Sequence, residues 1–140
     1  MATTMHVDIV SAEAEIFSGT AEMLTAQAED GEVGIMPRHA AYLARLQPGE
    51  VTVTLQGGER QGFYVSGGML EVQPHVTTVL ADTAVRAKDL DEAQAIQAKE
   101  AAEKAMADQK DKIDYAKAQA ELVEAAAKLQ TIQRMRSRGS

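Results

Sequence analysis

The chain has no cysteine and no tryptophan, and its aromatic residues are three tyrosines and two phenylalanines. Without cysteine it can form neither a disulfide framework nor a thiolate metal site. His6, His39 and His75 are far apart in the sequence and form no His-x-x-x-His pair, so no zinc site is predicted. We therefore interpret the histidines as surface or structural residues.

The sequence also lacks the common signatures of catalysis. It contains no Gly-x-x-x-x-Gly-Lys phosphate loop and no Gly-x-Ser-x-Gly elbow. Paired acids such as Glu13 and Glu15 could in principle serve a glycosidase as acid and base, but few aromatic rings are available to stack on a sugar. Solvated loops and strand faces explain these acids better. The sequence does not indicate an enzyme that acts alone.

Long apolar runs are missing as well. No stretch of 18 apolar residues is present, and the N-terminus has neither the basic segment nor the apolar segment of a signal peptide. The formal net charge of -7 argues against nucleic acid, because such binding depends on basic patches that neutralise phosphates. We expect a soluble, cytoplasmic protein with no nucleic-acid partner.

Glycine and proline are absent from Asp89 to Arg138, whereas all three prolines and every glycine except Gly139 precede that segment. Glycine and proline interrupt strands and form turns, and alanine, which is frequent after Asp89, is the best helix former. The boundary at Lys88 and Asp89 therefore predicts two substructures, a turn-rich one over residues 1–87 and a helical one over residues 88–138.

The first substructure has the two-residue period of β-strands. Val51, Val53 and Leu55 alternate with polar residues, which places one set on a core face. Similar short runs surround Val7, Met23, Val33, Val65, Leu70 and Val79. Turn signals separate them at Gly19, Asp30-Gly31, Pro37, Pro48-Gly49, Gly57-Gly58, Gly67-Gly68 and Pro74. This spacing is typical of a β-sandwich or flattened barrel, with the clearest hairpin at Gly57-Gly58.

The second substructure is predicted to be a helical hairpin. Asp89 is the expected N-cap of the first helix, with Glu92 three residues later as in a capping box, and this helix should end near Met106. The polar residues 108–112 interrupt the periodicity. A second helix should then run from about Asp114 to Arg136. Two helices on a short link form an antiparallel hairpin.

The second helix carries two apolar stripes. One follows heptad spacing, and the other lies nearly opposite to it. The members are Tyr115, Ala118, Leu122, Ala125, Leu129 and Ile132 in the first stripe, and Ala116, Ala120, Val123 and Ala127 in the second. The first helix can cover only one stripe. Either the β-domain covers the other, or that stripe docks on another protein.

Both stripes end in positive charge. Lys128, Arg134, Arg136 and Arg138 lie near the end of the second helix, where cations offset the helix dipole by about 0.3–1 kcal/mol each. The dipole alone is one explanation for them. An acidic protein partner is the other, because apolar contact followed by charge would recognise such a surface.

Specific strings resemble the epsilon subunit of bacterial F-type ATP synthases. They recur in the order of that family over nearly the whole chain, and they are Val10-Ser11-Ala12-Glu13 with Phe17-Ser18-Gly19, Gly31-Glu32-Val33-Gly34-Ile35 with Pro37 and His39-Ala40, Val65-Ser66-Gly67-Gly68 with Leu70-Glu71-Val72, Val79-Leu80-Ala81-Asp82-Thr83-Ala84, and Leu90-Asp91-Glu92-Ala93. The resemblance implies a β + α fold, a ten-stranded β-sandwich followed by a two-helix hairpin.

The same resemblance implies a non-catalytic rotor subunit. Its sandwich would bind the gamma subunit and rest on the c-ring, which couples proton-driven rotation to ATP synthesis on the alpha and beta subunits. Glu32, with Gly31 beside it, would face the c-ring, and Ser11 and His39 would lie near gamma. Arg38 belongs to the same interface, although relatives often have glycine at this position. The subunit would lie at the cytoplasmic face of the bacterial inner membrane, held there only through the complex.

In this family the hairpin can fold against the sandwich or extend toward the catalytic subunits and obstruct ATP hydrolysis. By resemblance, Lys128, Arg134 and Arg136 would contact acidic residues of the beta subunit. The two apolar stripes would then serve the two positions of the hairpin. A hairpin docked mostly through alanine can undock readily, because burying one methyl group contributes only about 0.8 kcal/mol.

One departure from the family concerns ATP. Many relatives bind ATP at the start of the first helix through an Ile/Leu-Asp-x-x-Arg-Ala motif, in which arginine meets phosphate. Here Gln94 replaces that arginine and cannot supply the charge, although Arg86, Lys88 and Asp91 could retain weak affinity. We therefore expect no ATP cofactor. The alternative hypothesis is a free-standing nucleotide-sensing module, and submillimolar ATP binding would favour it.

Overall fold

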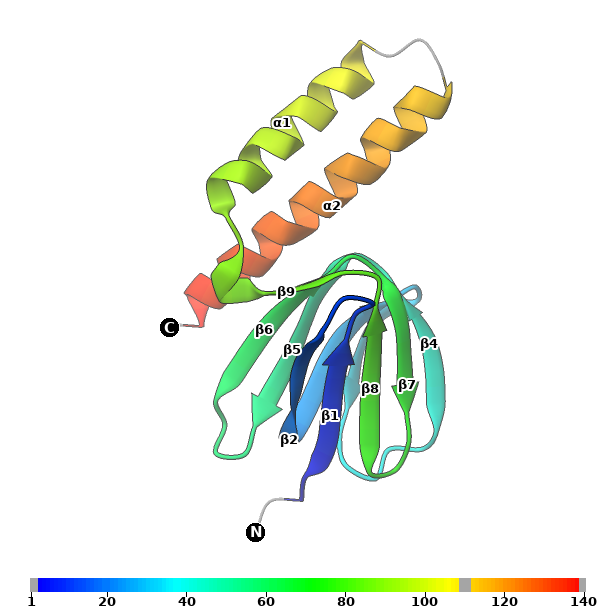
Figure 1. Cartoon of the computed structure of the whole chain (residues 1–140), viewed down its shortest axis with the longest axis vertical. Coiled ribbons are helices and arrows are strands. Elements are labelled where there is room, and N and C mark those ends of the chain that lie inside the picture. The colour runs from blue at the N-terminus through cyan, green and yellow to red at the C-terminus, as the bar shows by residue number, and fades with distance from the viewer. Residues whose placement is uncertain (1–2, 109–111, 139–140) are drawn as a thin grey trace.

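The computed structural model describes residues 3–108 and 112–138 and contains a β-sandwich with a helical hairpin projecting from one end (Figure 1). Within those residues there are nine strands rather than the predicted ten. Their bounds are β1 Met5–Val10, β2 Glu15–Ala28, β3 Gly31–Ile35, β4 Tyr42–Leu46, β5 Gly49–Leu55, β6 Arg60–Val65, β7 Gly68–Val72, β8 Val76–Ala81 and β9 Ala84–Arg86. The predicted division into a β part and an α part is confirmed.

The long strand β2 connects the two layers of the sandwich. Its first half pairs with β1, which continues the layer β1-β8-β7-β4, and its second half pairs with β3 and β5. Strands β6 and β9 extend that second layer. All pairings are antiparallel except that of β1 with β8. Side chains from the inner faces of both layers form the core.

Glycines explain two of the predicted turns and one wrong prediction. Gly57 and Gly58 have φ values of 99° and 95° in the β5–β6 turn, a conformation that L-residues rarely adopt. Gly67 and Gly68 connect β6 to β7 in the same left-handed region. Gly19 is not a turn, since it pairs with Val7 inside the β1–β2 ladder. A Cβ there would meet the Phe17 ring, so glycine leaves space for that ring.

The core consists of large apolar side chains from both layers. Ile9, Leu24, Phe63 and Leu70 are completely buried, and the Phe63 ring meets Phe17 edge-on at 5.6 Å between centroids. Fully burying each such side chain contributes about 1.5–3 kcal/mol. The sandwich therefore has a stable core of its own.

The first helix begins two residues later than predicted. After β9 the chain makes a 3-10 turn over Ala87–Asp89, and α1 spans Glu92–Ala107. Asp91, not Asp89, is the N-cap, because its side chain accepts a hydrogen bond from the Gln94 backbone N–H at 3.1 Å. The capping box with Glu92 at its third position is thus wrong, since Glu92 is the first helical residue.

The second helix, α2, spans Lys112–Ser137 and packs antiparallel to α1 (Figure 1). The predicted polar linker 108–112 lies mostly outside the described residues. On the heptad stripe of α2, Ala118 and Ala125 are buried, and on α1 the buried residues Ala95 and Ala102 repeat at the same seven-residue spacing. Alanine therefore supplies most of the buried contact between the helices. None of the described helices is long and apolar enough to cross a membrane.

Candidate functional site in the docked hairpin and the outer face of the sandwich

The C-terminal end of α2 contacts the sandwich at β5 and β6, and a buried carboxylate lies at the centre of this contact. Glu50 on β5 is only 5% exposed. Arg138 donates to both of its oxygens, from Nη1 to Oε1 at 3.2 Å and from Nη2 to Oε2 at 2.9 Å. The Arg134 guanidinium lies 4.0 Å from Oε1. We refer to Glu50, Arg134 and Arg138 as the Glu50 site.

The residue facing the Glu50 site on β6 is Gly62, and its lack of a side chain is required there. A Cβ at this position would overlap Oε2 of Glu50 and would lie 2.6 Å from Nη2 of Arg138. In the β5–β6 ladder, Gly62 is paired with Thr52, and Glu50 is two residues before Thr52 on β5. Glu50 and Gly62 therefore lie on the same face of the layer. The bidentate pair therefore fits only because β6 has glycine at this point.

The other cations predicted to meet a partner protein also have contacts within the chain. The Lys128 ammonium lies 5.4 Å from the centre of the Tyr64 ring and 3.5 Å from a carboxylate oxygen of Glu124. Arg136 pairs with Glu92 at the start of α1. In the docked hairpin, each of these basic side chains is thus occupied by an acid or a ring of the same chain.

Tyr64 lies on the sandwich surface that α2 covers, and the ionisation of its hydroxyl can report docking. Its ring is completely buried, and its hydroxyl has no hydrogen-bond partner among the described residues. Burial raises the pKa of the Tyr64 hydroxyl above its ordinary value of 10.0, and the nearby Glu124 carboxylate raises it further. Undocking of α2 would expose this group to water, so its ionisation reports the position of the hairpin.

The second apolar stripe of α2 is covered only at one end. Ala116, Ala120 and Val123 are exposed, with Val123 at 48%, whereas Ala127 is half-buried near the sandwich and Thr131 beyond it is buried. The prediction that the β-domain covers this stripe is therefore correct only for its C-terminal part. The rest is open to solvent in this arrangement.

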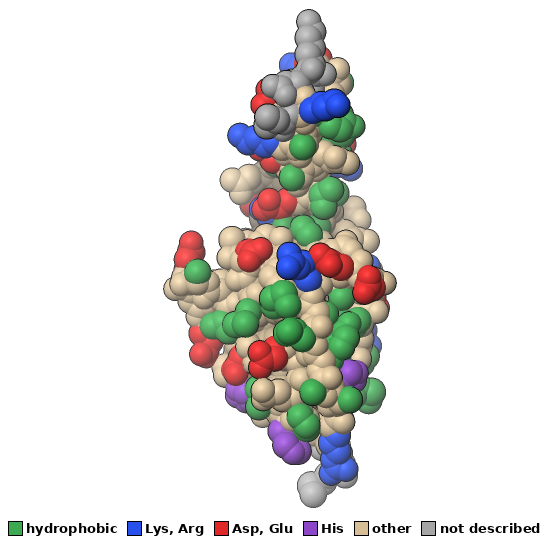
Figure 2. Space-filling view, turned by 90° about the vertical axis from the view of Figure 1, so that its right-hand side faces the viewer, with side chains coloured by type: hydrophobic (Ala, Val, Ile, Leu, Met, Phe, Trp, Pro, Cys, Tyr) green, Lys and Arg blue, Asp and Glu red, His purple; other side chains and the backbone are tan. Residues whose placement is uncertain are grey.

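The outer face of the layer β1-β8-β7-β4 carries exposed apolar side chains that the sequence interpretation missed. Leu43 and Leu80 are 65% and 48% exposed. Val10, Leu80 and Met69 are direct neighbours across β1, β8 and β7, and Leu43 lies two residues from the β4 partner of Met69. Figure 2 shows hydrophobic side chains gathered on this side of the sandwich, with charged side chains around them. We call Val10, Leu43, Met69 and Leu80 the outer patch.

Ser11 and His39 lie at opposite ends of that outer face. Ser11 follows Val10, which pairs with Leu80, whereas Arg38 before His39 donates its backbone N–H to the Pro74 carbonyl at the other end of β8. Leu80 and Pro74 are six residues apart, which corresponds to about 20 Å of extended chain. The ring of His39 lies 6.1 Å from that of Tyr42, the first residue of β4. One partner on the outer face could therefore reach both.

Arg38 has a backbone conformation that explains why glycine suits this position. Its φ is 66°, in the left-handed region, where a side chain costs roughly 1–2 kcal/mol. The hydrogen bond from its N–H to Pro74 holds the loop in that conformation at 3.0 Å.

Gly31 and Glu32 form the start of β3, away from the outer patch. Glu32 accepts a hydrogen bond from the Gln27 side chain at 2.8 Å, and one of its oxygens lies 4.0 Å from the Arg134 guanidinium. A residue predicted for the c-ring and a residue predicted for the beta subunit thus lie close together when the hairpin is docked. The sequence did not indicate this contact.

The three candidate nucleotide residues are divided between two hollows. Asp91 and Gln94 line a cleft between α1 and α2 of about 570 Å³, which we call the acidic cleft, whereas Arg86 lines a different cavity. The charged side chains around the acidic cleft are Asp89, Asp91, Glu121, Glu124 and Lys128. Four carboxylates and one lysine form a poor environment for phosphate, because like charges repel.

A polar cluster on β1 and β2 resembles a catalytic triad only in composition. The Ser18 hydroxyl donates to Asp8 at 2.7 Å, and both residues contact Nε2 of His6, at 3.2 Å and 2.8 Å. A nucleophilic triad needs serine and aspartate on different ring nitrogens. His6 therefore cannot activate Ser18 in this way. Among the described residues, no group of three acidic or histidine side chains is arranged to hold a metal.

Comparison with known proteins gives matches over nearly the whole chain. Residues 4–87 match the family described as ATP synthase, Delta/Epsilon chain, beta-sandwich domain, and residues 88–133 match its long alpha-helix domain. An ATP synthase epsilon chain of Thioalkalivibrio sulfidiphilus is 64% identical over 137 residues, covering 97% of both chains. One of Nitrosococcus oceani is 64% identical over 138 residues, covering 99% of both.

Solved structures confirm the arrangement of the fold. A chain in the cryo-EM structure of the Euglena gracilis mitochondrial ATP synthase matches with a TM-score of 0.76 at 18% identity, covering 98% of this chain and 82% of that one. A chain from the central stalk and c-ring of the Tetrahymena thermophila enzyme gives a TM-score of 0.63 at 14% identity, with 95% and 96% covered. With the outer patch, the docked hairpin and the full-length similarity to bacterial epsilon chains taken together, this chain belongs to the ATP synthase delta/epsilon-chain family.

Proposed function

We propose that this chain is a non-catalytic rotor subunit of a bacterial F-type ATP synthase, which couples rotation of the c-ring to ATP synthesis and restrains ATP hydrolysis through its helical hairpin. The observation that supports this best is that the sandwich and the hairpin present different surfaces. The sandwich has a buried core and exposes an apolar outer patch, while the end of the hairpin docks on it at a buried carboxylate paired with cations.

The outer patch is suited to a permanent protein partner. Exposed apolar side chains at its centre and charged groups around it are the usual composition of an interface. Arg45 and Glu71 lie on the same outer face as Leu43 and Met69 and can fix the orientation of a partner. We propose that the gamma subunit covers this patch and reaches Ser11 and His39, and that Gly31, Glu32 and Arg38 contribute to the contact with gamma and the c-ring.

The docked hairpin is proposed to be the position that permits hydrolysis. In this position Lys128, Arg134 and Arg136 contact groups of the same chain, so they cannot also bind the beta subunit. Undocking would release all three and expose the remainder of the second stripe. Contacts with the alpha and beta subunits would then compensate for those lost at the Glu50 site.

ATP is not proposed as a cofactor of this subunit. Gln94 lacks the charge that would meet a phosphate, and the carboxylates of the acidic cleft oppose a nucleotide there. We place the subunit at the cytoplasmic face of the inner membrane, attached only through the assembled complex.

Reconstitution tests the proposed function. The full-length protein is added to ATP synthase depleted of its epsilon subunit, and both retention of gamma and ATP hydrolysis are measured. We expect retention of gamma and a lower hydrolysis rate. A version ending at Lys88 should retain gamma and inhibit less, since it lacks the hairpin.

Two results would contradict the proposal. Failure of the full-length protein to retain gamma would remove the rotor assignment. Equal inhibition by the full-length and truncated versions would remove the role of the hairpin while leaving the rotor assignment intact. Leu43→Glu is the matched variant for the outer patch, because it should abolish retention of gamma without touching the core.

A further inference from the structure

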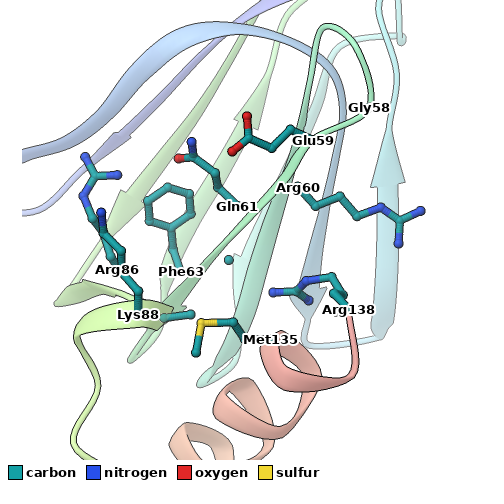
Figure 3. A pocket seen from close by; sticks show the side chains of 11 residues that line it. Gly58, Glu59, Arg60, Gln61, Phe63, Arg86, Lys88, Met135 and Arg138 are labelled. Carbon is teal, nitrogen blue, oxygen red and sulfur yellow. The ribbon is translucent and has the colours of Figure 1, made fainter. Parts of the chain in front are cut away.

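Two polar regions of the molecule differ in whether their side chains converge. The first lines a cavity of about 670 Å³ where the β5–β6 turn, the segment after β9 and the end of α2 meet (Figure 3). Arg60 and Phe63 are three residues apart on β6 and point to opposite faces, and Arg86 lies over the Phe63 ring. Figure 3 shows Arg60 pointing away from Arg86. The cations of this cavity therefore cannot all meet one small ligand.

The second region lies on the solvent face of β1 and β2, and its side chains do converge. Nε2 of His6 lies 2.8 Å from Oδ1 of Asp8 and 3.2 Å from Oγ of Ser18. The Ser18 hydroxyl donates to the same Oδ1 at 2.7 Å. One nitrogen and two oxygens thus form a closed triangle. We call these three residues the His6 cluster.

The pairing of β1 with β2 fixes the His6 cluster. Side chains two residues apart on a strand share a face, so His6 and Asp8 point the same way. Asp8 is paired with Ser18 across the ladder, and Val7 and Ile9 are completely buried on the opposite face. A site on packed strands is held more precisely than a site on a loop. The His-x-x-x-His spacing that this sequence lacks marks ligand pairs on helices and does not detect a pair on a strand.

The size of the triangle matches one face of an octahedral metal site. Zn²⁺ binds imidazole nitrogen and carboxylate oxygen at about 2.0–2.2 Å, and at these lengths two ligands at a right angle are about 3 Å apart. The three separations in the His6 cluster lie between 2.7 and 3.2 Å. Serine and aspartate contact the same ring nitrogen, which excludes a catalytic triad, but a common meeting point is what a metal ion requires.

Access and charge also favour a cation at the His6 cluster. The side chains of His6 and Asp8 are 46% and 31% exposed, so an ion can enter from solvent. Within residues 3–108 and 112–138, no lysine or arginine forms an ion pair with Asp8. The formal charge of -7 on the whole chain attracts cations as well.

We propose that the His6 cluster binds a divalent transition-metal ion through the His6 nitrogen, the Asp8 carboxylate and the Ser18 hydroxyl, with water in the remaining positions. The imidazole then carries its proton on Nδ1, so that the lone pair of Nε2 faces the ion. Imidazole selects ions such as Ni²⁺ and Zn²⁺ over Mg²⁺, which prefers oxygen ligands. The site contains no residue of the hairpin or of the Glu50 site, and it goes beyond the proposed rotor function.

Calorimetry with the full chain tests the proposal, with NiCl₂, ZnCl₂ and MgCl₂ titrated separately. We expect Ni²⁺ and Zn²⁺ to bind about tenfold or more tightly than Mg²⁺. His6→Gln and Asp8→Asn should each weaken Ni²⁺ binding by about tenfold or more, and Ser18→Ala should weaken it less, because a hydroxyl is a neutral ligand. All three changes lie on the solvent face, so circular dichroism should show an intact fold. The control His75→Ala removes another exposed imidazole and should bind Ni²⁺ normally.

Nuclear magnetic resonance then locates the ion. Ni²⁺ is paramagnetic, so it should broaden the amide signals of β1 and β2 around Asp8 and Ser18 before those of other strands. Broadening centred on His39 or His75 instead would overturn the proposal. It would also be overturned if the wild type bound no Ni²⁺, or if His6→Gln or Asp8→Asn bound Ni²⁺ as tightly as the wild type.

Discussion

The core of the sandwich and the contacts of the hairpin differ in how they are stabilised. In the sandwich, Leu24, Phe63 and Leu70 are fully buried in a two-layer core. In the hairpin the buried residues are mostly alanines, such as Ala95 and Ala118, and each methyl contributes only about 0.8 kcal/mol. These alanines hold the two helices together, whereas α2 meets the sandwich at the Glu50 site and at the Tyr64 ring. The comparison explains how one part can remain folded while the other changes position.

The largest effect is expected inside the sandwich. Leu70→Ala removes a fully buried side chain from β7 and should lower the free energy of unfolding by about 2–5 kcal/mol, because it leaves a cavity. Urea unfolding followed by circular dichroism measures this. Ile96→Ala on the exposed side of α1 is the control and should change stability by no more than about 0.5 kcal/mol. Equal losses would contradict the difference between the two parts.

A smaller and more specific effect is expected at the Glu50 site. Arg138→Gln leaves a buried carboxylate without its main partner, which disfavours docking by about 1.5–3 kcal/mol, or roughly 10- to 150-fold. Undocking exposes Glu50 to water, so the sandwich itself should keep its stability. Since the chain has no cysteine, fluorescent labels at Ala116→Cys and His75→Cys can report the distance by energy transfer.

The control for this experiment is Lys117→Gln, which removes a charge from the exposed side of α2. It should leave energy transfer unchanged. If Arg138→Gln also left it unchanged, the Glu50 site would not determine the position of the hairpin.

The pH dependence of docking should follow Tyr64. Because burial raises its pKa above the ordinary 10.0, the docked state favours the protonated hydroxyl. Docking is then unaffected by this group below about pH 10 and weakens as the pH rises above it. Ultraviolet titration should show one tyrosine that ionises late in the wild type and nearer the ordinary value in Arg138→Gln. A late tyrosine in both proteins, with energy transfer reduced in Arg138→Gln, would indicate that α2 does not cover Tyr64.

The smallest effect is expected at Lys128. Its ammonium lies over the Tyr64 ring and is partly open to solvent, and such contacts contribute about 0.5–1 kcal/mol. Lys128→Gln should reduce docking by a few-fold, less than Arg138→Gln, in the same energy-transfer measurement. A larger effect than that of Arg138→Gln would mean that the ring contact, and not the buried carboxylate, dominates docking.

Local patterns in the sequence were sufficient for most of the fold. The absence of glycine and proline after Asp89 predicted the helices, and Gly57-Gly58 predicted the β5–β6 turn. Two local errors have physical causes. Asp89 and Asp91 both fit an N-cap, and only the 3-10 turn over Ala87–Asp89 decides between them. Gly19 looked like a turn because its true role, space for a neighbouring ring, depends on packing.

The site was harder to predict because its parts are distant in sequence. Glu50 alternates with Val51 and Val53, which indicated an exposed position, and α2 covers that face from 88 residues away. The outer patch was missed for a similar reason, since Val10, Met69 and Leu80 become neighbours only through strand pairing. Ser11 and His39 were predicted as interface residues through the resemblance to the epsilon family. The pairing of β1 with β8 explains how one partner could reach both.

The central claim is that the docked hairpin restrains its own inhibitory action, and Glu50→Gln tests it most directly. This change weakens the contact with Arg138 but leaves every cation of α2 in place. ATP hydrolysis is measured in epsilon-depleted ATP synthase reconstituted with wild-type or Glu50→Gln protein at equal retention of gamma. Our account predicts stronger inhibition by Glu50→Gln, because its hairpin is released more readily. Equal or weaker inhibition at equal retention of gamma would contradict it.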